Sequence, residues 1–399
     1  MNPTEPELIR VESGGRLIGL VAIDSTISGR SRGGLRLVPE LDDDELRLAA
    51  RAMTLKYGLL ELPQGGAKAA VQGDPDRPVA ERRARLLELG HAIEPLLRAR
   101  RYVPDADLGT SAADMRWLFS RLELPVVPRE WRVGDSGAWT AESVVSAARA
   151  AVEHSGRSLG GATVAVEGFG AVGSAVAELA AAAGARVVAI STSRGALVRM
   201  EGLEVAACVA AARREGSAFV QRYPAAQQVT REELLALRVD VLFPCARARS
   251  VTRSNVDSVR AKLVCPGANA PLTLEAEGAL AARGVLVMPD FFANCGGVLG
   301  GTMAFAAIEP GRIGHLIAHQ VGATARTLLE RAEQAGVPPR MIAEQIAFAR
   351  LARVRSAVEQ PTLVGRLFAF ALDGYRRGLI PGRLVGALAP GWFARRLRL

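Results

Sequence analysis

Cysteine is scarce in this chain of 399 residues. The four cysteines, Cys208, Cys245, Cys265 and Cys295, are widely spaced and form no CxxC pair. This spacing indicates free thiols in a reducing compartment and argues against a disulfide framework or a zinc site. Aromatic residues make up only 5% of the chain, so alanine, valine, leucine and isoleucine must fill the interior.

Long apolar runs are also missing. No run approaches the roughly 20 residues that a membrane-spanning helix needs. The segment Met1–Arg10 carries acidic residues and no apolar signal core, which makes export an unlikely fate. We therefore expect a cytoplasmic protein that does not contact a membrane.

Lysine is rare in comparison with arginine. The 50 basic residues include only three lysines, Lys56, Lys68 and Lys262, and all the others are arginines. Arginine cannot give up its proton, whereas a buried lysine can have its pKa lowered and act as a base. Lys56 and Lys68 lie close in sequence, and Lys68 stands in a glycine-rich segment. We predict functional roles for these two lysines and none for Lys262.

The chain is basic, with a net charge of +9 and an isoelectric point of about 10.1. Its arginines are scattered, and the densest stretches, 82–85 and 395–398, are short and lack interleaved aromatics. Nucleic-acid binding by stacking is therefore not expected. His315 and His319 have a spacing that zinc could use. No HExxH glutamate or nearby cysteine accompanies them, so we expect no metal site.

The length predicts two domains. Alternating apolar residues predict strands at 7–12, 16–24 and 35–38, and helices are expected at 42–59, 79–99 and 111–121. From about residue 137 short apolar strands alternate with helices, which is typical of a parallel sheet covered on both faces. We predict an α/β fold with a first domain over 1–137, a second over 138–335, and C-terminal helices over 336–399 that return to the first domain.

A strand that runs into GxGxxG and then a helix occupies residues 163–183. Gly168 permits the tight turn, Gly170 lets a pyrophosphate approach the backbone, and Gly173 allows the helix to pack on the strand. The strand before the motif and the helix after it make this a Rossmann-like, nucleotide-binding signature. The predicted cofactor-binding residues of the loop are Gly168, Phe169, Gly170, Ala171, Val172 and Gly173.

The strand after this helix would end in an acid if it held the ribose of NAD. It ends instead in Ser191, Thr192, Ser193 and Arg194. Hydroxyl groups beside an arginine suit a 2′-phosphate, so Thr192 and Ser193 are expected to contact NADP, with NAD as the alternative.

With these segments identified, the chain resembles the glutamate/leucine/phenylalanine/valine dehydrogenase family from about Leu17 to about Glu309. Several segments are similar to family motifs and occur in the family's order: Gly33-Gly34-Leu35-Arg36, Met53-Thr54-Leu55-Lys56, Leu62-Pro63-Gln64-Gly65-Gly66-Ala67-Lys68, Asp107-Leu108-Gly109-Thr110, Gly267-Ala268-Asn269 and the stretch 289–298.

The resemblance implies an oxidative deamination of an L-amino acid with NAD or NADP. Lys56 would hold the substrate α-carboxylate, Lys68 would activate the attacking water, and Asp107 would exchange protons with the amine. Thr140 and Asn294 would orient the nicotinamide amide, and Cys245, Ala246 and Asn269 are further expected cofactor contacts. A neutral amine is needed at Lys68, and we expect the cation of Lys56 to lower its pKa. Asp105 is the rival acid, interpreted as a solvated loop residue.

The substrate stays open between glutamate and leucine, phenylalanine or valine. Arg32 could pair with a side-chain carboxylate, and with Gly34 and Lys56 it forms the expected substrate site, which favours glutamate slightly. Ala69-Ala70, the stretch 140–143 and Arg247-Ala248-Arg249 depart from the family pattern. A relative that has lost catalysis and regulates a partner is therefore the alternative function. Family resemblance also implies a closed homo-oligomer, a hexamer or an octamer.

Overall fold

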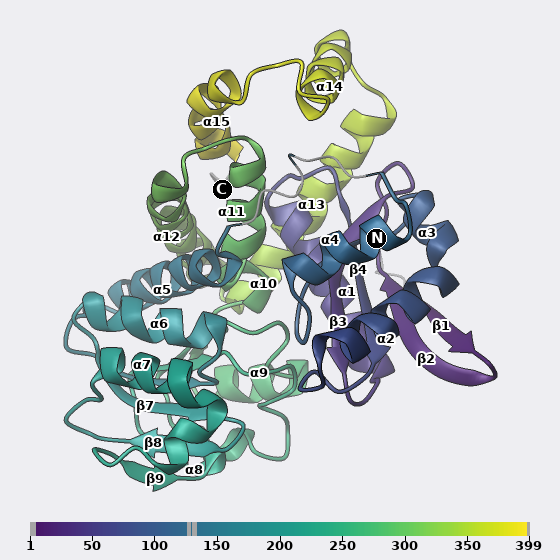
Figure 1. Cartoon of the computed structure of the whole chain (residues 1–399). Helices are drawn as coiled ribbons and strands as arrows, with labels where there is room; N and C mark the ends of the chain where they lie inside the picture. The colour runs from purple at the N-terminus through teal and green to yellow at the C-terminus, as the bar shows by residue number, and fades with distance from the viewer. Residues whose placement is uncertain (1–4, 126–128, 130–133, 397–399) are drawn as a thin grey trace. The chain divides into compact units, whose positions relative to one another are not determined.

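The computed structural model describes residues 5–125, 129 and 134–396. The chain forms two compact units. One comprises residues 1–133, 305–307 and 346–387, and the other comprises 134–304, 308–345 and 388–399. Figure 1 labels the elements of both.

The first unit is built on a five-stranded sheet in the order β1-β2-β4-β3-β5. Its strands are β1 (Glu7–Ser13), β2 (Arg16–Ile23), β3 (Ser31–Val38), β4 (Gly65–Gln72) and β5 (Val103–Ala106). The antiparallel hairpin β1–β2 forms one edge, β2 pairs antiparallel with β4, and β3 lies parallel between β4 and β5. The strand predicted at 35–38 begins four residues earlier, at Ser31. From the sequence we interpret Gly33-Gly34 as a break before the strand, but this pair lies inside it.

Helices cover both faces of this sheet. Helix α1 (Asp43–Leu59) begins at Asp42, whose side chain accepts a hydrogen bond from the Glu45 amide at 2.9 Å. It packs on the face that carries Leu20, Ala22 and Ala70. The helices α2 (Val79–Ala92), α3 (Glu94–Arg98) and α4 (Ala112–Arg121) complete this part of the unit. The predicted helix 79–99 is thus two helices, and α2 and α4 pack over the opposite face of the sheet.

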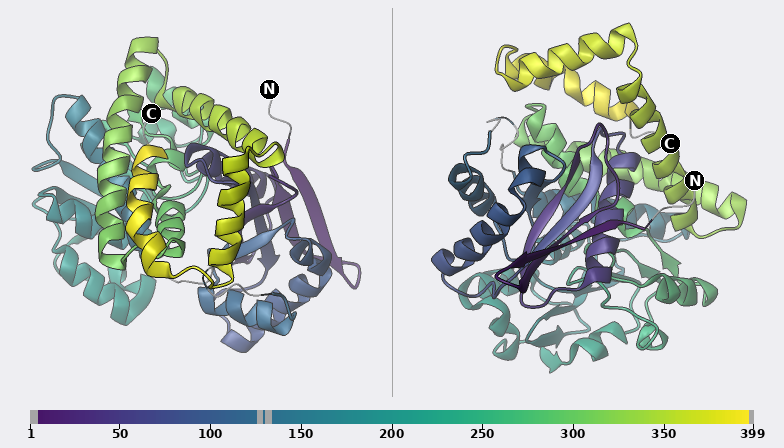
Figure 2. Two further views of the ribbon diagram at one scale, coloured as in Figure 1. Left: turned by 90° about the horizontal axis from the view of Figure 1, so that it is seen from above. Right: turned by 90° about the vertical axis from the view of Figure 1, so that its right-hand side faces the viewer.

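The C-terminal part consists of three helices joined by short turns, α13 (Pro339–Glu359), α14 (Leu363–Arg376) and α15 (Gly382–Arg396) (Figure 2). In the first unit, Arg350 of α13 donates to the carbonyl of Leu59 at 2.7 Å. Pro390 lies inside α15, which continues through it.

The second unit holds a seven-stranded sheet in the order β12-β11-β10-β6-β7-β8-β9. Its strands are β6 (Thr163–Glu167), β7 (Arg186–Thr192), β8 (Gly195–Val198), β9 (Gln227–Val229), β10 (Val241–Pro244), β11 (Leu263–Val264) and β12 (Leu286–Val287). The five strands from β12 to β7 are parallel, as the alternation of strands and helices predicted. The sequence did not predict β8 and β9, which extend the sheet by antiparallel pairing (Figure 1).

The helices of this unit are α5 (Ser136–His154), α6 (Ala171–Ala182), α7 (Val205–Glu215), α8 (Arg231–Leu235), α9 (Leu274–Ala282), α10 (Asp290–Ala293), α11 (Gly296–Phe305) and α12 (Pro310–Ala335). Helix α5 packs along α6 and α12. The α/β fold class predicted from the sequence is confirmed. No helix in the described part of the chain is long and apolar enough to cross a membrane.

Candidate functional site

Strand register brings the predicted catalytic residues to one face of the first sheet. Lys68 on β4 lies opposite Ala22, and Arg36 on β3 lies opposite Ala70. Ala22 and Ala70 both pack under α1. Because side chains two residues apart share a face of a strand, Lys68 and Arg36 lie on the face that α1 covers. Asp107 follows β5 directly and turns back over Gly34, which is the cross-strand neighbour of Asp105.

Four charged side chains form a chain of ion pairs on this face. The Nζ of Lys68 contacts Oδ2 of Asp107. The Nε of Arg36 lies 3.3 Å from the same oxygen, and its Nη1 donates to Glu45 on α1 at 2.6 Å. The Lys68 and Arg36 side chains are 4% and 9% exposed, so these charges interact with little screening.

Burial sets the protonation of the central pair. It lowers the pKa of Lys68; Asp107 acts in the opposite direction, and the neighbouring Arg36 lowers this pKa further. Burial alone would raise the pKa of Asp107, but Lys68 and Arg36 outweigh it and hold that pKa below its ordinary value. The sequence analysis expected Lys56 to lower the pKa of Lys68, and the structure identifies Arg36 as a cation that does so. Its only sequence signal was its place in the Gly-Gly-x-Arg segment.

Lys56 lies on α1 and is 5% exposed. Helix α1 approaches β4 closely because Gly66 has no side chain: a Cβ there would stand 2.6 Å from the carbonyl oxygen of Ala50 and against the backbone of Thr54. Thr54 precedes Lys56 by two residues, and Gly66 precedes Lys68 by two residues. The glycine-rich segment that the sequence singled out is therefore the surface on which this helix packs.

Arg32 already has a carboxylate partner. Its Nε and Nη2 donate to Oδ2 and Oδ1 of Asp105, each at 2.6 Å. Asp105 lies on β5 and not in a loop, and its partly exposed carboxylate forms this bidentate pair. The fork of Arg32 that was expected to meet a substrate carboxylate is engaged within the chain.

The glycine loop of the second unit has the conformation that its motif predicts. Gly168 adopts φ +91°, which favours glycine. A Cβ on Gly168 would stand 2.6 Å from the amide nitrogen of Ala246, and one on Gly173 would stand 2.9 Å from the carbonyl carbon of Gly168. The predicted cofactor residues Cys245 and Ala246 thus pack directly on the loop. The Ser191 hydroxyl accepts from the Gly168 amide at 3.0 Å.

Two features of this unit fit a bound dinucleotide. A Cβ on Gly170 would meet no atom within 4 Å, and no side chain caps the start of α6, so the helix N-terminus can receive a phosphate. Asn294 donates through Nδ2 to the carbonyl of Ala268 at 2.8 Å and to Oδ1 of Asn269 at 3.2 Å. Its buried Oδ1 has no hydrogen-bond partner among the described residues, and it could accept from a carboxamide.

Thr140 lies on α5 beside the start of α11. Its hydroxyl donates to the carbonyl of Ser136 at 2.7 Å, and a Cβ on Gly297 would stand 2.7 Å from that hydroxyl. The amide of Gly296 donates to the Ser143 hydroxyl at 3.0 Å. The late glycine pair therefore lets α11 approach α5 next to Asn294.

The segment after β7 is a tight turn into β8. The Thr192 hydroxyl donates to the carbonyl of Ser217 at 2.8 Å and accepts from the Arg194 amide at 3.1 Å. Ser193 and Arg194 are exposed. No acidic residue occupies this turn, as the sequence predicted.

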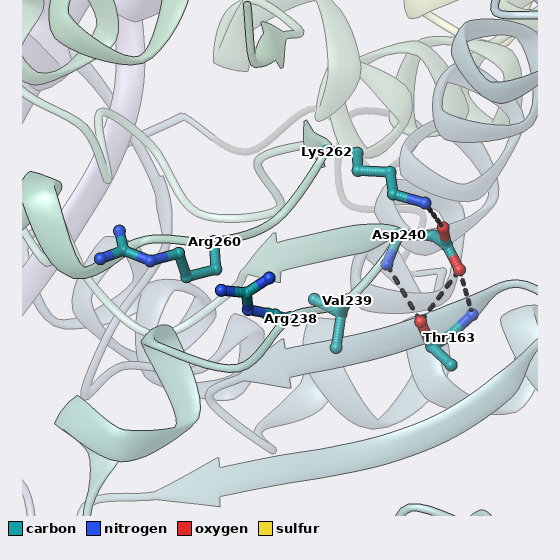
Figure 3. A pocket seen from close by; sticks show the side chains of 6 residues that line it. All are labelled: Thr163, Arg238, Val239, Asp240, Arg260 and Lys262. Carbon is teal, nitrogen blue, oxygen red and sulfur yellow. Dashed lines mark hydrogen bonds and ion pairs between the residues drawn. The ribbon is translucent and has the colours of Figure 1, made fainter. Parts of the chain in front are cut away.

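A cavity of about 400 Å³ lies elsewhere in this unit, at the end of the sheet where the strands β6, β10 and β11 begin. Figure 3 shows its lining. Lys262 and Thr163 both contact Asp240 there, at 2.9 Å each. The glycine loop follows the other end of β6. Lys262 thus takes part in a surface ion pair. No group of metal-binding side chains occurs among the described residues.

Comparison with known proteins agrees with this arrangement. Residues 134–358 match the family described as Glutamate/Leucine/Phenylalanine/Valine dehydrogenase, and residues 9–123 match the Glu/Leu/Phe/Val dehydrogenase dimerisation domain. The chain is 34% identical to a glutamate dehydrogenase of Thermotoga maritima over 283 residues, which is 68% of each chain. It is 35% identical to glutamate dehydrogenase B of Halobacterium salinarum over 296 residues, covering 70% of this chain and 68% of the relative.

Solved structures show the same architecture. The hetero-hexameric glutamate dehydrogenase of Thermus thermophilus in its leucine-bound form has a TM-score of 0.75 and 27% identity, with 90% of each chain covered. The L-tryptophan dehydrogenase of Nostoc punctiforme shares the fold, with a TM-score of 0.59 and 22% identity over 88% of this chain and 97% of that one. The chain belongs to the glutamate/leucine/phenylalanine/valine dehydrogenase family and is an amino-acid dehydrogenase, an oxidoreductase acting on a CH–NH₂ group with NAD or NADP.

Proposed function

We propose that this enzyme catalyses the reversible oxidative deamination of L-glutamate to 2-oxoglutarate and ammonia. The observation that carries the reaction is the buried Lys68–Asp107 pair with Arg36 beside it. Support for glutamate comes from relatives that are glutamate dehydrogenases. It no longer comes from Arg32, whose fork is held by Asp105. Leucine, phenylalanine and valine are the competing substrates.

The residues divide the chemistry among themselves. The bound nicotinamide cofactor supplies the hydride acceptor, and Asn294 and Thr140 would orient its amide. The Lys56 ammonium binds the substrate α-carboxylate, and the Asp107 carboxylate accepts a hydrogen bond from the substrate amine. Once hydride has left the α-carbon, the resulting iminium carbon is attacked by water. Lys68, as a neutral amine, takes the proton from that water.

Proton transfer then releases ammonia. Asp107, which takes a proton from the substrate ammonium before hydride leaves, returns that proton to the nitrogen of the carbinolamine. Ammonia then departs, the carbinolamine hydroxyl gives its proton to solvent, and the 2-oxo acid forms. An amine can act as a base near neutral pH only if its pKa is lowered, and burial lowers the pKa of Lys68 in this way. Asp107 is ionised before the substrate binds because its pKa is held low, so it can accept the proton of the substrate ammonium.

We further propose that the cofactor is NADP. The turn after β7 carries Thr192, Ser193 and the exposed Arg194 and has no carboxylate. Among the described residues the Arg194 guanidinium has no hydrogen bond or ion pair, so it is available for a 2′-phosphate. One relative, from Saccharolobus shibatae, is an NADP-specific glutamate dehydrogenase. We also propose that the chain forms a homo-oligomer, since the matching Thermus thermophilus enzyme is hexameric.

The test is a spectrophotometric assay of the purified protein with NAD⁺ or NADP⁺ and a panel of L-amino acids. We expect formation of reduced cofactor, fastest with glutamate. Lys68→Met should lower kcat at least a hundredfold, because removal of a general base typically costs that much. Lys262→Met is the matched control, since this lysine is exposed, and it should keep full activity. Cofactor binding without turnover of any amino acid would instead support the regulatory alternative.

A further inference from the structure

Arg36 is the one side chain of the cluster that contacts two different carboxylates. Its Nε lies 3.3 Å from Asp107 Oδ2, the oxygen that also contacts Lys68. Its Nη1 donates to Glu45 at 2.6 Å. Glu45 in turn belongs to the first turn of α1, where its amide bonds to the Asp42 side chain. The guanidinium is therefore held from two sides, by a strand-end loop and by a helix N-terminus.

We propose that Arg36, anchored by Glu45, is a positioning residue that holds the Asp107 carboxylate in place for its proton exchange with the substrate amine. This inference rests on the proposed function, because it assigns Asp107 and Lys68 their catalytic roles. Arg36 does not itself touch the reacting atoms in this scheme. It acts through Asp107 and through its charge next to Lys68.

Geometry explains why an arginine is required. The planar fork directs Nε and Nη1 to two acceptors at once, whereas a lysine offers a single point charge. Asp107 is additionally fixed by its own loop, where its Oδ1 accepts from the Leu108 amide at 2.8 Å. The two oxygens of Asp107 are thus held separately, one by the backbone and one by the two cations.

The charge of Arg36 adds an effect that an uncharged side chain making the same hydrogen bonds would lack. Burial lowers the pKa of Lys68. The negative charge of Asp107 raises this pKa, and the positive charge of Arg36 lowers it further. Burial would lower the pKa of Arg36 too, but Asp107 and Glu45 outweigh it and raise that pKa, so Arg36 stays charged. The other charged or titratable groups that act on the pair or on its neighbours are Asp105 and Tyr102 at β5, Arg32 on β3 and Tyr57 on α1. Lys56 is buried on the same helix as Tyr57.

Charge changes at the two ends of the Arg36–Glu45 pair give opposite predictions for the pH profile of kcat/KM in deamination. In Arg36→Gln the Lys68 ammonium loses a repulsive neighbour, so its pKa rises. The acidic limb of the kcat/KM profile should therefore move to higher pH, by roughly one pH unit. In Glu45→Gln the cluster becomes more positive, and the limb should move the other way by a smaller amount. The double variant should bring the limb back towards that of the wild type.

Arg36→Lys keeps the charge but loses the fork. We expect its acidic limb to stay in place while kcat falls, because Asp107 is less well oriented. Arg10→Gln is the matched control: Arg10 also pairs with an acid of the first turn of α1, Asp43 at 2.5 Å, but is exposed. Its profile and activity should equal those of the wild type.

The inference is overturned if Arg36→Gln leaves the limb unmoved, or if Arg36→Gln and Glu45→Gln move it in the same direction. If thermal melting shows that Arg36→Gln does not fold, the other two variants still test the inference. Glu45→Gln should move the acidic limb to lower pH, and Arg36→Lys should leave it in place. Failure of the proposed function looks different. It would appear as a wild-type enzyme without amino-acid turnover or with turnover independent of Lys68.

Discussion

At the scale of single residues, Gly34 shows how closely the site is packed. A Cβ on this glycine would stand 2.6 Å from Cβ and 2.8 Å from Cγ of Asp107. Asp107 can lie over β3 only because position 34 has no side chain. The sequence analysis named Gly34 as part of the substrate site, and its contact is with Asp107, the acid that we propose to be catalytic.

Gly34→Ala should therefore displace Asp107 and lower kcat/KM by at least about tenfold, because small misplacements of a catalytic group are costly. The measurement is steady-state kinetics together with thermal melting of the same samples. Gly278→Ala is the control, since a Cβ at this position in α9 meets no atom within 4 Å. It should leave activity unchanged. Wild-type kinetics in Gly34→Ala would contradict the role given to this contact.

At the scale of elements, the short turn between β7 and β8 decides the proposed cofactor preference. Antiparallel pairing of Thr192 with Gly195 leaves only Ser193 and Arg194 between the strands. The Thr192 hydroxyl is used to hold the turn through Ser217 and the Arg194 amide. Ser193 and the Arg194 guanidinium are left for the cofactor.

Arg194→Ala should raise KM for NADP⁺ about tenfold or more and change KM for NAD⁺ little, since a hydrogen bond to a charged group contributes about 1.5–3 kcal/mol. Ser193→Asp should reverse the preference, because a carboxylate accepts from the ribose hydroxyls and repels the 2′-phosphate. Initial rates with both cofactors measure this. Arg213→Ala, at an exposed position of α7, serves as the control. An equal loss for both cofactors in Arg194→Ala would argue against NADP selection by this turn.

At the scale of the whole molecule, apolar side chains remain exposed on one helix. Five of the large ones lie on α14: Leu363, Val364, Leu367, Phe368 and Phe370, each more than half exposed. Contiguous apolar surface of this kind is uncommon on monomeric proteins and usually marks a contact with another molecule.

We accordingly expect the purified chain to form a closed homo-oligomer whose mass is a multiple of 42.1 kDa. Size-exclusion chromatography with light scattering would measure this at micromolar concentrations. The mass should stay constant on moderate dilution, because closed symmetric assemblies do not grow further. A species of monomer mass across that range would contradict the proposal.

Much of the fold was predictable because its signals are local. Asp42 and the acidic turn after it predicted the start of α1, and the spacing of Gly168, Gly170 and Gly173 predicted the strand–turn–helix of the nucleotide loop. The strands β8 and β9 were missed because they are short and pair antiparallel at the end of an otherwise parallel sheet.

The sequence by itself determined the family, the alternation of strands and helices, and the types of group at the site, since spacing and residue chemistry are properties of short segments. Tertiary structure alone decided which charges meet. Arg36 and Asp107 are 71 positions apart and come together because β3 pairs with β5. The same pairing brings Arg32 to Asp105, and the pairing of β3 with β4 brings Arg36 near Lys68. Such pairings depend on strand order, which no local pattern in the chain encodes.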